Sequence, residues 1–414
     1  MGRADRLSGQ SAGEYPKIMT DRDMPHDTAP LTHSTPPLRS SDRSAPAAIR
    51  DITVEAGRLP AFSSHERVVE VSDARLGLTA FIAIHDTTLG PALGGCRVVA
   101  YPSRAAALTD ALRLSRAMTY KAALAELGLG GGKTVVMAEP GARYPEAFYR
   151  SLGRAIESLG GRYITGEDSG TSVREMDWIN RETPHVIGTS GRGGDPSLMT
   201  ADGVLQGIRE TVRHRLGVTN LAGVTVAVQG LGHVGAVLCE KLAAAGARLI
   251  VGDVDTPRVD AVVRACGAAP VAPDYIHRVR ADVFAPCALG AVLNVRTIPE
   301  LRCATVAGSA NNQLAEARDG LDLHARGILY APDYVVNAGG LISAAVGLTG
   351  EDPNGPVAQE KVAAIGRTLD EIYRRSQSDG LPPEILADRV AEERLDAARA
   401  AASRARPSGR IRSL

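Results

Sequence analysis

The sequence predicts an α/β protein with two domains and a cleft between them. At 414 residues the chain is long enough to form two hydrophobic cores. The second half contains a glycine-rich turn between a buried strand and a helix, with an acidic residue further on, which is typical of dinucleotide-binding folds. The first half alternates strands and helices around two lysines, Lys121 and Lys133.

The expected divisions follow the composition along the chain. They are a disordered extension at 1–50, a substrate domain at 51–190, a dinucleotide-binding domain at 191–375, helices that pack back on the substrate domain at 376–402, and a flexible tail at 403–414. The extension carries six prolines among serines and charged residues, and such a segment buries too little apolar surface to offset its chain entropy.

Charge and cysteine usage exclude several classes of protein. The 47 basic and 47 acidic side chains cancel, so there is no overall electrostatic footprint for nucleic acid or an anionic membrane. Five cysteines without a Cys-x-x-Cys motif, and nine histidines without metal-ligand spacing, argue against a disulfide framework and a bound metal. No apolar run suits a membrane span or a signal core. We therefore expect a soluble cytoplasmic protein.

Strands and a glycine-rich loop open the substrate domain. Residues 67–73 and 77–85 read as two strands joined by a turn. Residues 89–97, which include Gly94 and Gly95, read as a loop whose backbone could face a ligand. A helix is predicted at 103–118.

The predicted helix delivers Lys121 at or just past its end, and Lys133 follows a run of glycines. Ser103 is the expected N-cap of this helix. Lys133 is expected to leave a glycine turn at the mouth of a buried strand, where desolvation would lower its pKa and suit it to polarise or attack a carbonyl. A surface lysine after a loop is the alternative. Leu127 stands where a phosphate-binding loop needs glycine, so a nucleoside triphosphatase is disfavoured.

Asp168 is a second candidate site residue. It follows a predicted helix at 145–159 and a strand at 162–165, and ligands of α/β proteins gather beyond the carboxyl ends of strands. Ser172 and Glu175 form a capping box for the next helix. An aspartate in Asp-Ser-Gly is also a common turn residue. The shared setting with Lys133 at strand boundaries favours a functional role.

The second half predicts a Rossmann domain. Residues 224–229 read as a buried parallel strand that runs directly into Gly230, with a helix at 236–245. A second strand at 248–253 ends in Asp253, 23 residues after Gly230. A strand, glycine turn, helix and acid at this spacing indicate dinucleotide binding.

Each residue of this motif has a physical task. Gly230 permits the tight turn, Gly232 the approach of a pyrophosphate and Gly235 the packing of helix on strand, while Asp253 binds the adenosine ribose hydroxyls. An acid at this position repels a 2′-phosphate, so NAD is favoured over NADP, although Arg258 lies nearby.

Polar residues follow the later strands of this domain. Asn311, Asn312 and Asn337 come after short apolar strands, where they could contact a ligand or form turns. Residues 352–400 are predicted helical, and the arginine-rich end reads as a solvated tail rather than a nucleic-acid arm.

Together these motifs resemble the Glu/Leu/Phe/Val amino-acid dehydrogenase family, most closely its leucine, valine and phenylalanine branch. The resemblance covers residues 66–394, about four fifths of the chain. The matching segments are 88–97, 118–121, 129–133, 167–171, 228–232, 285–290, 308–314 and 331–340. The extension at the front has no counterpart in the family.

The resemblance implies NAD-dependent oxidative deamination of an L-amino acid with an apolar side chain, reversible as reductive amination, by a homo-oligomer. Lys133 would polarise the carbonyl of the 2-oxo acid and stabilise the carbinolamine oxygen, and Asp168 would be the general base. Lys121 would pair with the substrate carboxylate, helped by Asn337. Gly94 and Gly95 would border the substrate, and its side-chain pocket would be lined by Gly166, Leu341 and Ala344. NAD would be held by Thr200, Gly230, Leu231, Gly232, His233, Val234, Gly235, Asp253 and Asn312.

The chain departs from the family at positions that transfer no proton. His233 and Ala122 stand where asparagine is usual, and Cys96 stands where threonine is usual. Gly166 and Ala344 are smaller than the alanine and valine that look typical of leucine enzymes. We therefore expect a pocket with room beyond leucine, for an aromatic or unusual amino acid.

Two other classes remain as alternatives. A 2-hydroxy-acid dehydrogenase needs a histidine near the nicotinamide, and no histidine of this sequence clearly follows a strand end in that position. A non-catalytic NAD-binding protein has no need of Lys121, Lys133 and Asp168 together.

Overall fold

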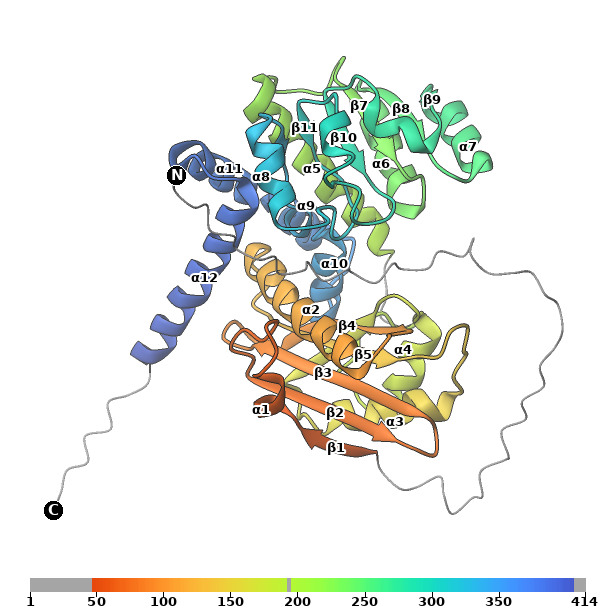
Figure 1. Ribbon diagram of the computed structural model, residues 1–414, viewed down its shortest axis with the longest axis vertical. Coiled ribbons are helices and arrows are strands. Elements are labelled where there is room, and N and C mark those ends of the chain that lie inside the picture. The colour runs from red at the N-terminus through yellow and green to blue at the C-terminus, as the bar shows by residue number, and fades with distance from the viewer. Residues whose placement is uncertain (1–46, 192–194, 406–414) are drawn as a thin grey trace, which may run out of the picture. The chain divides into compact units, whose positions relative to one another are not determined.

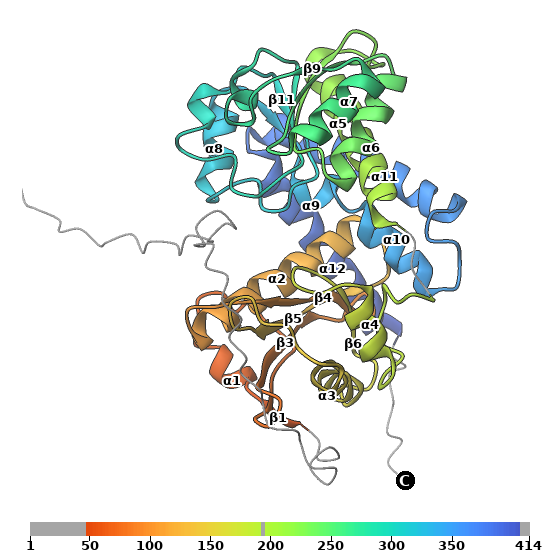
Figure 2. The same cartoon turned by 90° about the vertical axis from the view of Figure 1, so that its right-hand side faces the viewer.

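The computed structural model describes residues 47–191 and 195–405 of the chain (Figures 1 and 2). The expected extension up to residue 46 and the tail from residue 406 lie outside the described residues. The extension was expected to end at residue 50, whereas strand β1 already begins at Ala48. Its four side chains are all exposed, so no apolar alternation marks this strand in the sequence.

The first sheet is mixed and has the strand order β1-β2-β3-β5-β4-β6. Strands β1, β2, β3 and β5 pair antiparallel in turn, and β4 pairs parallel with both β5 and β6. The strands are β1 Ala48–Asp51, β2 Arg67–Asp73, β3 Leu78–Asp86, β4 Ala92–Val99, β5 Gly130–Met137 and β6 Tyr163–Glu167. In this order the sheet places β4 between β5 and β6.

Two expectations for this sheet were wrong. The segment expected to be a glycine loop is mostly strand β4, and the glycine run before Lys133 belongs to β5 rather than to a turn. Glycine is depleted in strands, so the glycine-rich composition of these two segments did not indicate strands β4 and β5. The glycines serve close packing: a Cβ at Gly94 would collide with the carbonyl of Gly132, and one at Gly131 would collide with the backbone of Thr119.

Helices cover both faces of the first sheet (Figure 1). They are α1 Thr53–Ala56, α2 Arg104–Leu124, α3 Glu146–Glu157 and α4 Val173–Asn180. Helix α2 extends beyond the predicted end at residue 118, so Lys121 lies in its last turn. The predicted caps are confirmed: Ser103 accepts a hydrogen bond from the amide of Ala106, and Ser172 with Glu175 forms the capping box of α4.

The second sheet is entirely parallel, with the order β12-β11-β10-β7-β8-β9. Its strands are β7 Thr225–Gln229, β8 Arg248–Gly252, β9 Ala269–Pro270, β10 Val283–Pro286, β11 Thr305–Val306 and β12 Leu329–Tyr330. The strand order reverses direction at β7, which is the switch point where ligands of Rossmann folds bind. The chain is thus an α/β protein with a Rossmann sheet, as predicted, and its first sheet is mixed.

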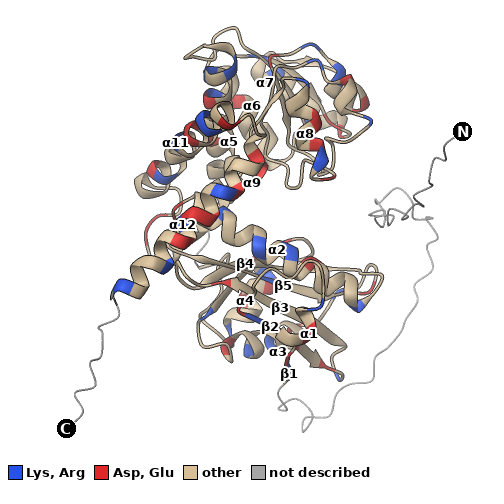
Figure 3. Cartoon of the chain, turned by 60° about the vertical axis from the view of Figure 1, so that its left-hand side comes forward, with Lys and Arg blue, Asp and Glu red and all other residues tan. Residues whose placement is uncertain are grey.

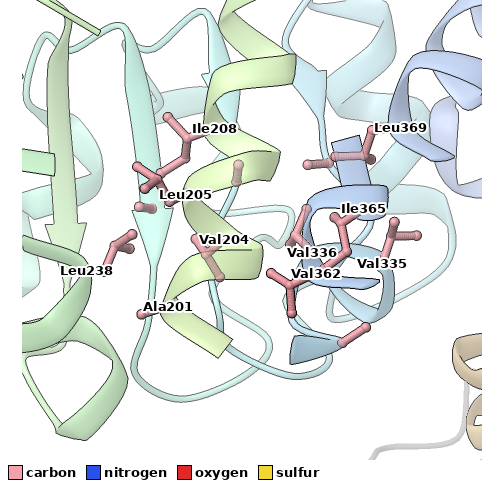
Figure 4. Packing of buried hydrophobic residues seen from close by; sticks show 14 of the residues in the cluster. Ala201, Val204, Leu205, Ile208, Leu238, Val335, Val336, Val362, Ile365 and Leu369 are labelled. Carbon is pink, nitrogen blue, oxygen red and sulfur yellow. The ribbon is translucent and has the colours of Figure 1, made fainter. Parts of the chain in front are cut away.

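Helices of the second half pack on the parallel sheet or on one another. They are α5 Pro196–Leu216, α6 His233–Ala244, α7 Thr256–Cys266, α8 Arg318–Ala325, α9 Asp333–Val336, α10 Gly339–Leu348, α11 Pro356–Asp379 and α12 Pro383–Ala405, with 3₁₀ turns η2 Pro273–Arg278 and η3 Ile298–Glu300. Figure 4 shows side chains of α5 packed between Leu238 on one side and residues of α9 and α11 on the other. Their burial removes a large apolar area from water and holds these helices in one core.

The last helix contacts the first half of the chain. Glu392 of α12 accepts a hydrogen bond of 2.6 Å from the hydroxyl of Tyr120, and Arg394 donates to the carbonyls of Ala123 and Leu124 at the end of α2. Figure 3 shows acidic and basic residues interleaved along α12. These contacts agree with a C-terminal segment that packs back on the substrate domain, while the exact domain boundaries remain a prediction. Within the described ranges, no helix has the length and apolar character to cross a membrane.

Candidate active site

Strands β5 and β6 bring Lys133 and Asp168 together, as the sequence led us to expect. The ammonium of Lys133 forms an ion pair with Oδ2 of Asp168, and Lys133 is only 6% exposed. Gly95 of the intervening strand β4 lies directly beneath this pair. A Cβ at Gly95 would lie 2.7 Å from Cβ of Asp168 and 3.3 Å from Nζ of Lys133. The strand order therefore creates the pair, and glycine at position 95 leaves room for it.

Burial and charge act in opposite directions on this pair. Burial lowers the pKa of Lys133 below its ordinary value, although the charge of Asp168 opposes the shift. Burial alone would raise the pKa of Asp168, but the positive charges of Lys133 and Arg97 outweigh it, and the pKa lies below its usual value. Burial and the neighbouring charges thus shift the pKa of both groups, as is common at functional sites.

Arg97 is a member of the site that the sequence analysis missed. Its Nε lies 3.5 Å from Oδ2 of Asp168, and its Nη1 donates to Oδ2 of Asp110 over 3.1 Å. The hydroxyl of Tyr101 donates to the same oxygen of Asp110 at 2.6 Å. Arg97 stands two residues after Gly95 and so faces the same side of β4. Alternation along the strand would have indicated it, had the segment been recognised as a strand.

Lys121 connects the two halves of the chain. Its ammonium donates a hydrogen bond of 2.6 Å to Oδ1 of Asn337, which follows α9. The amide nitrogen of Asn337 in turn donates to Oδ1 of Asn311 at 2.8 Å and to the carbonyl of Ser309 at 3.1 Å. Burial lowers the pKa of Lys121 to about 8. The structure thus assembles Lys121 and Asn337, which were predicted to act together.

Gly94 has a packing role in addition to any contact with a ligand. Its carbonyl accepts a hydrogen bond of 2.8 Å from the hydroxyl of Tyr163, and the ring of Tyr163 occupies the space beside Gly132. Tyr163 is fully buried. A border on the substrate, as expected for Gly94 and Gly95, remains a prediction for both residues.

The predicted side-chain pocket is partly filled by a residue that the sequence analysis did not consider. A Cβ at Gly166 would lie 2.8 Å from Cγ1 of Ile187, so the space that glycine leaves is occupied by Ile187. Ile187 and Leu341 pack on one apolar cluster, whose buried members are Leu93, Ala122, Leu129, Ile164 and Ala345. Ala344 lies on the same helix as Leu341 and is half-buried. Gly166 therefore adds no free space, and room beyond leucine at Ala344 remains a prediction.

The glycine turn after β7 has the shape needed for a dinucleotide. Gly230 has φ of +91°, and a Cβ at Gly235 would collide with the carbonyl of Gly230, so both positions require glycine. A Cβ at Gly232 would meet only the end of Arg258, at 3.8 Å, which leaves its backbone open to a ligand. Helix α6 begins at the next residue and directs its amides towards this turn.

Asp253 lies at the tip of β8 beside this turn. Its Oδ2 accepts a hydrogen bond of 2.5 Å from the amide of Leu231, and its Oδ1 accepts one of 2.8 Å from Asp255. Arg258 forms an ion pair with Asp255 at 3.1 Å, so its charge is already matched by an acid. The residues present therefore fit a dinucleotide with free ribose hydroxyls better than one with a 2′-phosphate.

The other predicted cofactor residues occupy several elements. His233 opens α6, and Val234 packs on the hydrophobic core of the second half. The hydroxyl of Thr200 on α5 would lie 3.0 Å from a Cβ at Gly340. Asn312 is exposed, with φ of +51°, next to Asn311. Their contacts with a cofactor remain predictions.

A separate polar cluster lies on helices α5 and α11. Glu210, His214 and Asp370 place ligand atoms within 4.8 Å of one another, an arrangement that the search for metal-ligand spacing did not foresee. Arg213 lies among them, bonded to Glu210 and 2.5 Å from Oδ1 of Asp370, and Arg374 binds the other oxygen of Asp370 at 2.6 Å. The two arginines balance both acids, and the cluster joins the two helices.

Comparisons with known proteins place these features in context. Residues 65–185 match the profile of the Glu/Leu/Phe/Val dehydrogenase dimerisation domain, and residues 254–375 match that of Glutamate/Leucine/Phenylalanine/Valine dehydrogenase. The chain is 49% identical to leucine dehydrogenase of Thermoactinomyces intermedius over 80% of this chain and 91% of that protein. It is 42% identical to phenylalanine dehydrogenase of Bacillus thermotolerans, over 81% and 89%.

A solved structure is similar as well. The crystal structure of L-tryptophan dehydrogenase from Nostoc punctiforme superposes with a TM-score of 0.74 at 41% identity, covering 81% of this chain and 97% of that chain.

Proposed function

The chain belongs to the Glu/Leu/Phe/Val dehydrogenase family and is an L-amino-acid dehydrogenase of the leucine, phenylalanine and tryptophan branch, and we propose that it uses NAD to deaminate amino acids with bulky apolar side chains. The observation that carries the proposal is the placement of the Lys133–Asp168 ion pair and of Lys121, bonded to Asn337, as electrostatic partners in one buried site. Two cations and one carboxylate complement a zwitterionic substrate.

Lys121 and Asn337 hold the substrate carboxylate in this proposal. The ammonium of Lys121 supplies the charge. Oδ1 of Asn337, whose amide nitrogen donates to Asn311 and Ser309, accepts from this ammonium and so orients it towards the carboxylate. Because Lys121 belongs to α2 and Asn337 follows α9, the group that binds the carboxylate is positioned by both halves of the chain. This contact fixes Cα relative to the turn at Gly230–Gly235, where NAD would bind and supply the hydride acceptor.

In the proposed reaction Asp168 transfers protons and Lys133 stabilises the oxygen of the intermediate. Asp168 accepts a proton from the substrate ammonium, because Cα releases hydride only when the nitrogen lone pair is free. Asp168 passes this proton to solvent, and after oxidation it takes a proton from the water whose oxygen adds to the imine carbon, while Lys133 stabilises the resulting carbinolamine oxygen. Asp168 then returns that proton to nitrogen. As the carbon–nitrogen bond breaks and ammonia leaves, Asp168 takes the hydroxyl proton and the carbonyl of the 2-oxo acid forms.

The substrate side chain lies against Ile187, Leu341 and Ala344 in this proposal. The smaller Ala344 supports a preference for side chains at least as large as leucine, in keeping with relatives that are named phenylalanine and tryptophan dehydrogenases. Such pockets discriminate by only about 1 to 3 kcal/mol per methylene, so several apolar amino acids should react. The dimerisation profile matched by residues 65–185 also supports assembly of the chain with copies of itself.

The proposed roles are tested with Lys133→Ala and Asp168→Asn. NADH formation from leucine, valine, phenylalanine and tryptophan at alkaline pH is the measurement. Each variant should lose at least about a hundredfold in kcat, because each removes a group that moves protons or stabilises charge in the transition state. Lys241→Ala is the matched control, since Lys241 on α6 also pairs with an acid, Asp202 on α5, and takes no part in the proposed site.

Two results would contradict the proposal. If Asp168→Asn or Lys133→Ala keeps near-parent kcat, that residue does not have its assigned role. If kcat/KM is clearly highest for valine, the pocket is smaller than proposed.

A further inference from the structure

Arg97 has a contact that the proposed chemistry leaves unexplained. Its Nε lies 3.5 Å from Oδ2 of Asp168, and both atoms are buried. Among the described residues Nε of Arg97 forms no hydrogen bond, whereas Oδ2 of Asp168 forms the ion pair with Lys133. A buried N–H donor without a hydrogen bond is costly, so a guanidinium held in this place needs a reason.

We propose that Arg97 is a positioning residue that takes over the carboxylate of Asp168 when Lys133 turns from it to the substrate oxygen. The inference rests on the proposed function, in which Lys133 stabilises the carbinolamine oxygen and Asp168 moves protons. A small rotation of Asp168 is enough to convert the contact with Nε of Arg97 into a hydrogen bond. The base then stays oriented and charged during the step in which Lys133 has left it.

The anchoring of Arg97 supports this role. Asp110 on α2 accepts from Nη1 of Arg97 and from the hydroxyl of Tyr101, so the guanidinium is anchored through a different nitrogen from the one that faces Asp168. Lys133 has no such second anchor: among the described residues, Asp168 is the partner of its ion pair. Of the two cations beside Asp168, Lys133 is therefore the one free to follow the substrate, and Arg97 is the one that remains.

Several titratable and charged groups surround Asp168 and determine how its pKa responds to the loss of Arg97. The groups that face it directly or act on it through a neighbour are Lys133 on β5, Arg97 and Cys96 on β4, Lys121 and Asp110 on α2, and Glu175 on α4. Of these only Arg97 and Lys133 lie within ion-pair distance of its carboxylate. Removal of Arg97 consequently changes the charge next to Asp168 most when Lys133 is engaged elsewhere.

The pH dependence of kcat and of kcat/KM separates these situations, with Arg97→Gln and Arg97→Lys as the variants. In Arg97→Gln the acid inflection of kcat should move to higher pH by roughly one to three units, because an opposite charge beside the carboxylate is lost. The inflection of kcat/KM should move less, since Lys133 still pairs with Asp168 in the free enzyme. Arg97→Lys keeps the charge and should restore the inflection of kcat towards that of the parent.

Arg104→Gln is the matched control, because Arg104 is likewise bound by two acids, Glu55 and Glu70, on the same sheet domain. It should leave both inflections in place. A uniform fall in kcat for Arg97→Gln without any movement of its inflection, or a failure of Arg97→Lys to restore it, would overturn the inference. If Asp168→Asn is inactive in the same experiments, a contrary result for the Arg97 variants overturns only the inference about Arg97. If Asp168→Asn stays active, the proposed function itself fails.

Discussion

At the scale of single residues, burial lowers the pKa of two lysines, Lys121 and Lys133. The glycine-rich setting of Lys133 predicted that its pKa would be depressed, and the structure agrees in direction, with burial as the main cause. The same effect acts on Lys121, whose pKa falls to about 8. The two ammonium groups also repel each other, which adds to the shift of Lys121. For both lysines the charge of Asp168 opposes the lowering of the pKa by burial.

Binding of a carboxylate should weaken as the pH rises through about 8. Above this value the free enzyme loses the proton of Lys121, and the ligand loses its counter-charge. The inhibition constant of an inert branched carboxylic acid should rise by about tenfold per pH unit in this range. Lys121→Arg should flatten the dependence, because arginine stays charged. An inhibition constant that stays constant from pH 7 to about 10 in the parent enzyme would contradict this role for Lys121.

At the scale of elements, the glycines of β5 let a helix lie directly on the sheet. A Cβ at Gly131 would collide with the backbone of Thr119, and His85 of β3 reaches the hydroxyl of Thr119 at 2.8 Å. Helix α2 is thereby seated on the sheet at the turn just before Lys121. The spacing between Lys121 on the helix and Lys133 on the strand follows from this close contact.

Gly131→Ala should separate helix α2 from strand β5. The added methyl overlaps backbone atoms that cannot rotate away, and overpacking of this kind costs about 1 to 3 kcal/mol of unfolding free energy. The displacement of Lys121 should also raise KM for the amino acid more than it lowers kcat. Chemical denaturation and steady-state kinetics measure the two effects.

Gly366→Ala is the control for this substitution. Gly366 lies in helix α11, and a Cβ there meets no atom within 4 Å. It should raise the unfolding free energy by about 0.5 to 1 kcal/mol, the usual gain for alanine over glycine in a helix, and leave KM unchanged. Equal losses in both variants would show that the contact of Gly131 with α2 is not the cause.

At the scale of the whole molecule, helix α12 joins the halves and carries a carboxylate without a partner. Glu384 lies in its first turn, and among the described residues neither of its oxygens has a hydrogen bond. The carboxylate lies against Gly320 of α8, where a side chain would have no space. Burial raises the pKa of Glu384 from 4.5 to about 7. Its ionisation therefore opposes folding.

Glu384→Gln should stabilise the protein only at higher pH. Because the folded pKa is raised, the stability associated with Glu384 is complete below pH 4.5 and is lost as the pH rises through about 7. The variant should gain up to roughly 3 kcal/mol of unfolding free energy at pH 8 and nothing near pH 4. Denaturation with urea at both pH values is the measurement. A gain of equal size at both would mean that packing, not charge, is responsible.

Much of this architecture could be predicted because it depends on short segments of sequence. The turn at Gly230, the acid at Asp253, the caps at Ser103 and Ser172 and the two lysines are each set by a few neighbouring residues and their local geometry. The strands β4 and β5 could not be predicted, since their glycines lower strand propensity while serving contacts with distant residues. Ile187 was missed because it belongs to no local motif of its own, and only its contact with Gly166, a residue distant in the sequence, relates it to the predicted pocket.

By itself the sequence determined the family, the α/β class with a Rossmann half, and the identity of the groups that carry charge. Only the tertiary structure decided how these groups meet. The order β5-β4-β6 places Lys133, Gly95 and Asp168 side by side and adds Arg97 behind them. Residues that come from different strands and helices acquire their distances, and hence their shifted pKa values, from strand pairing and helix packing, which no local pattern in the chain encodes.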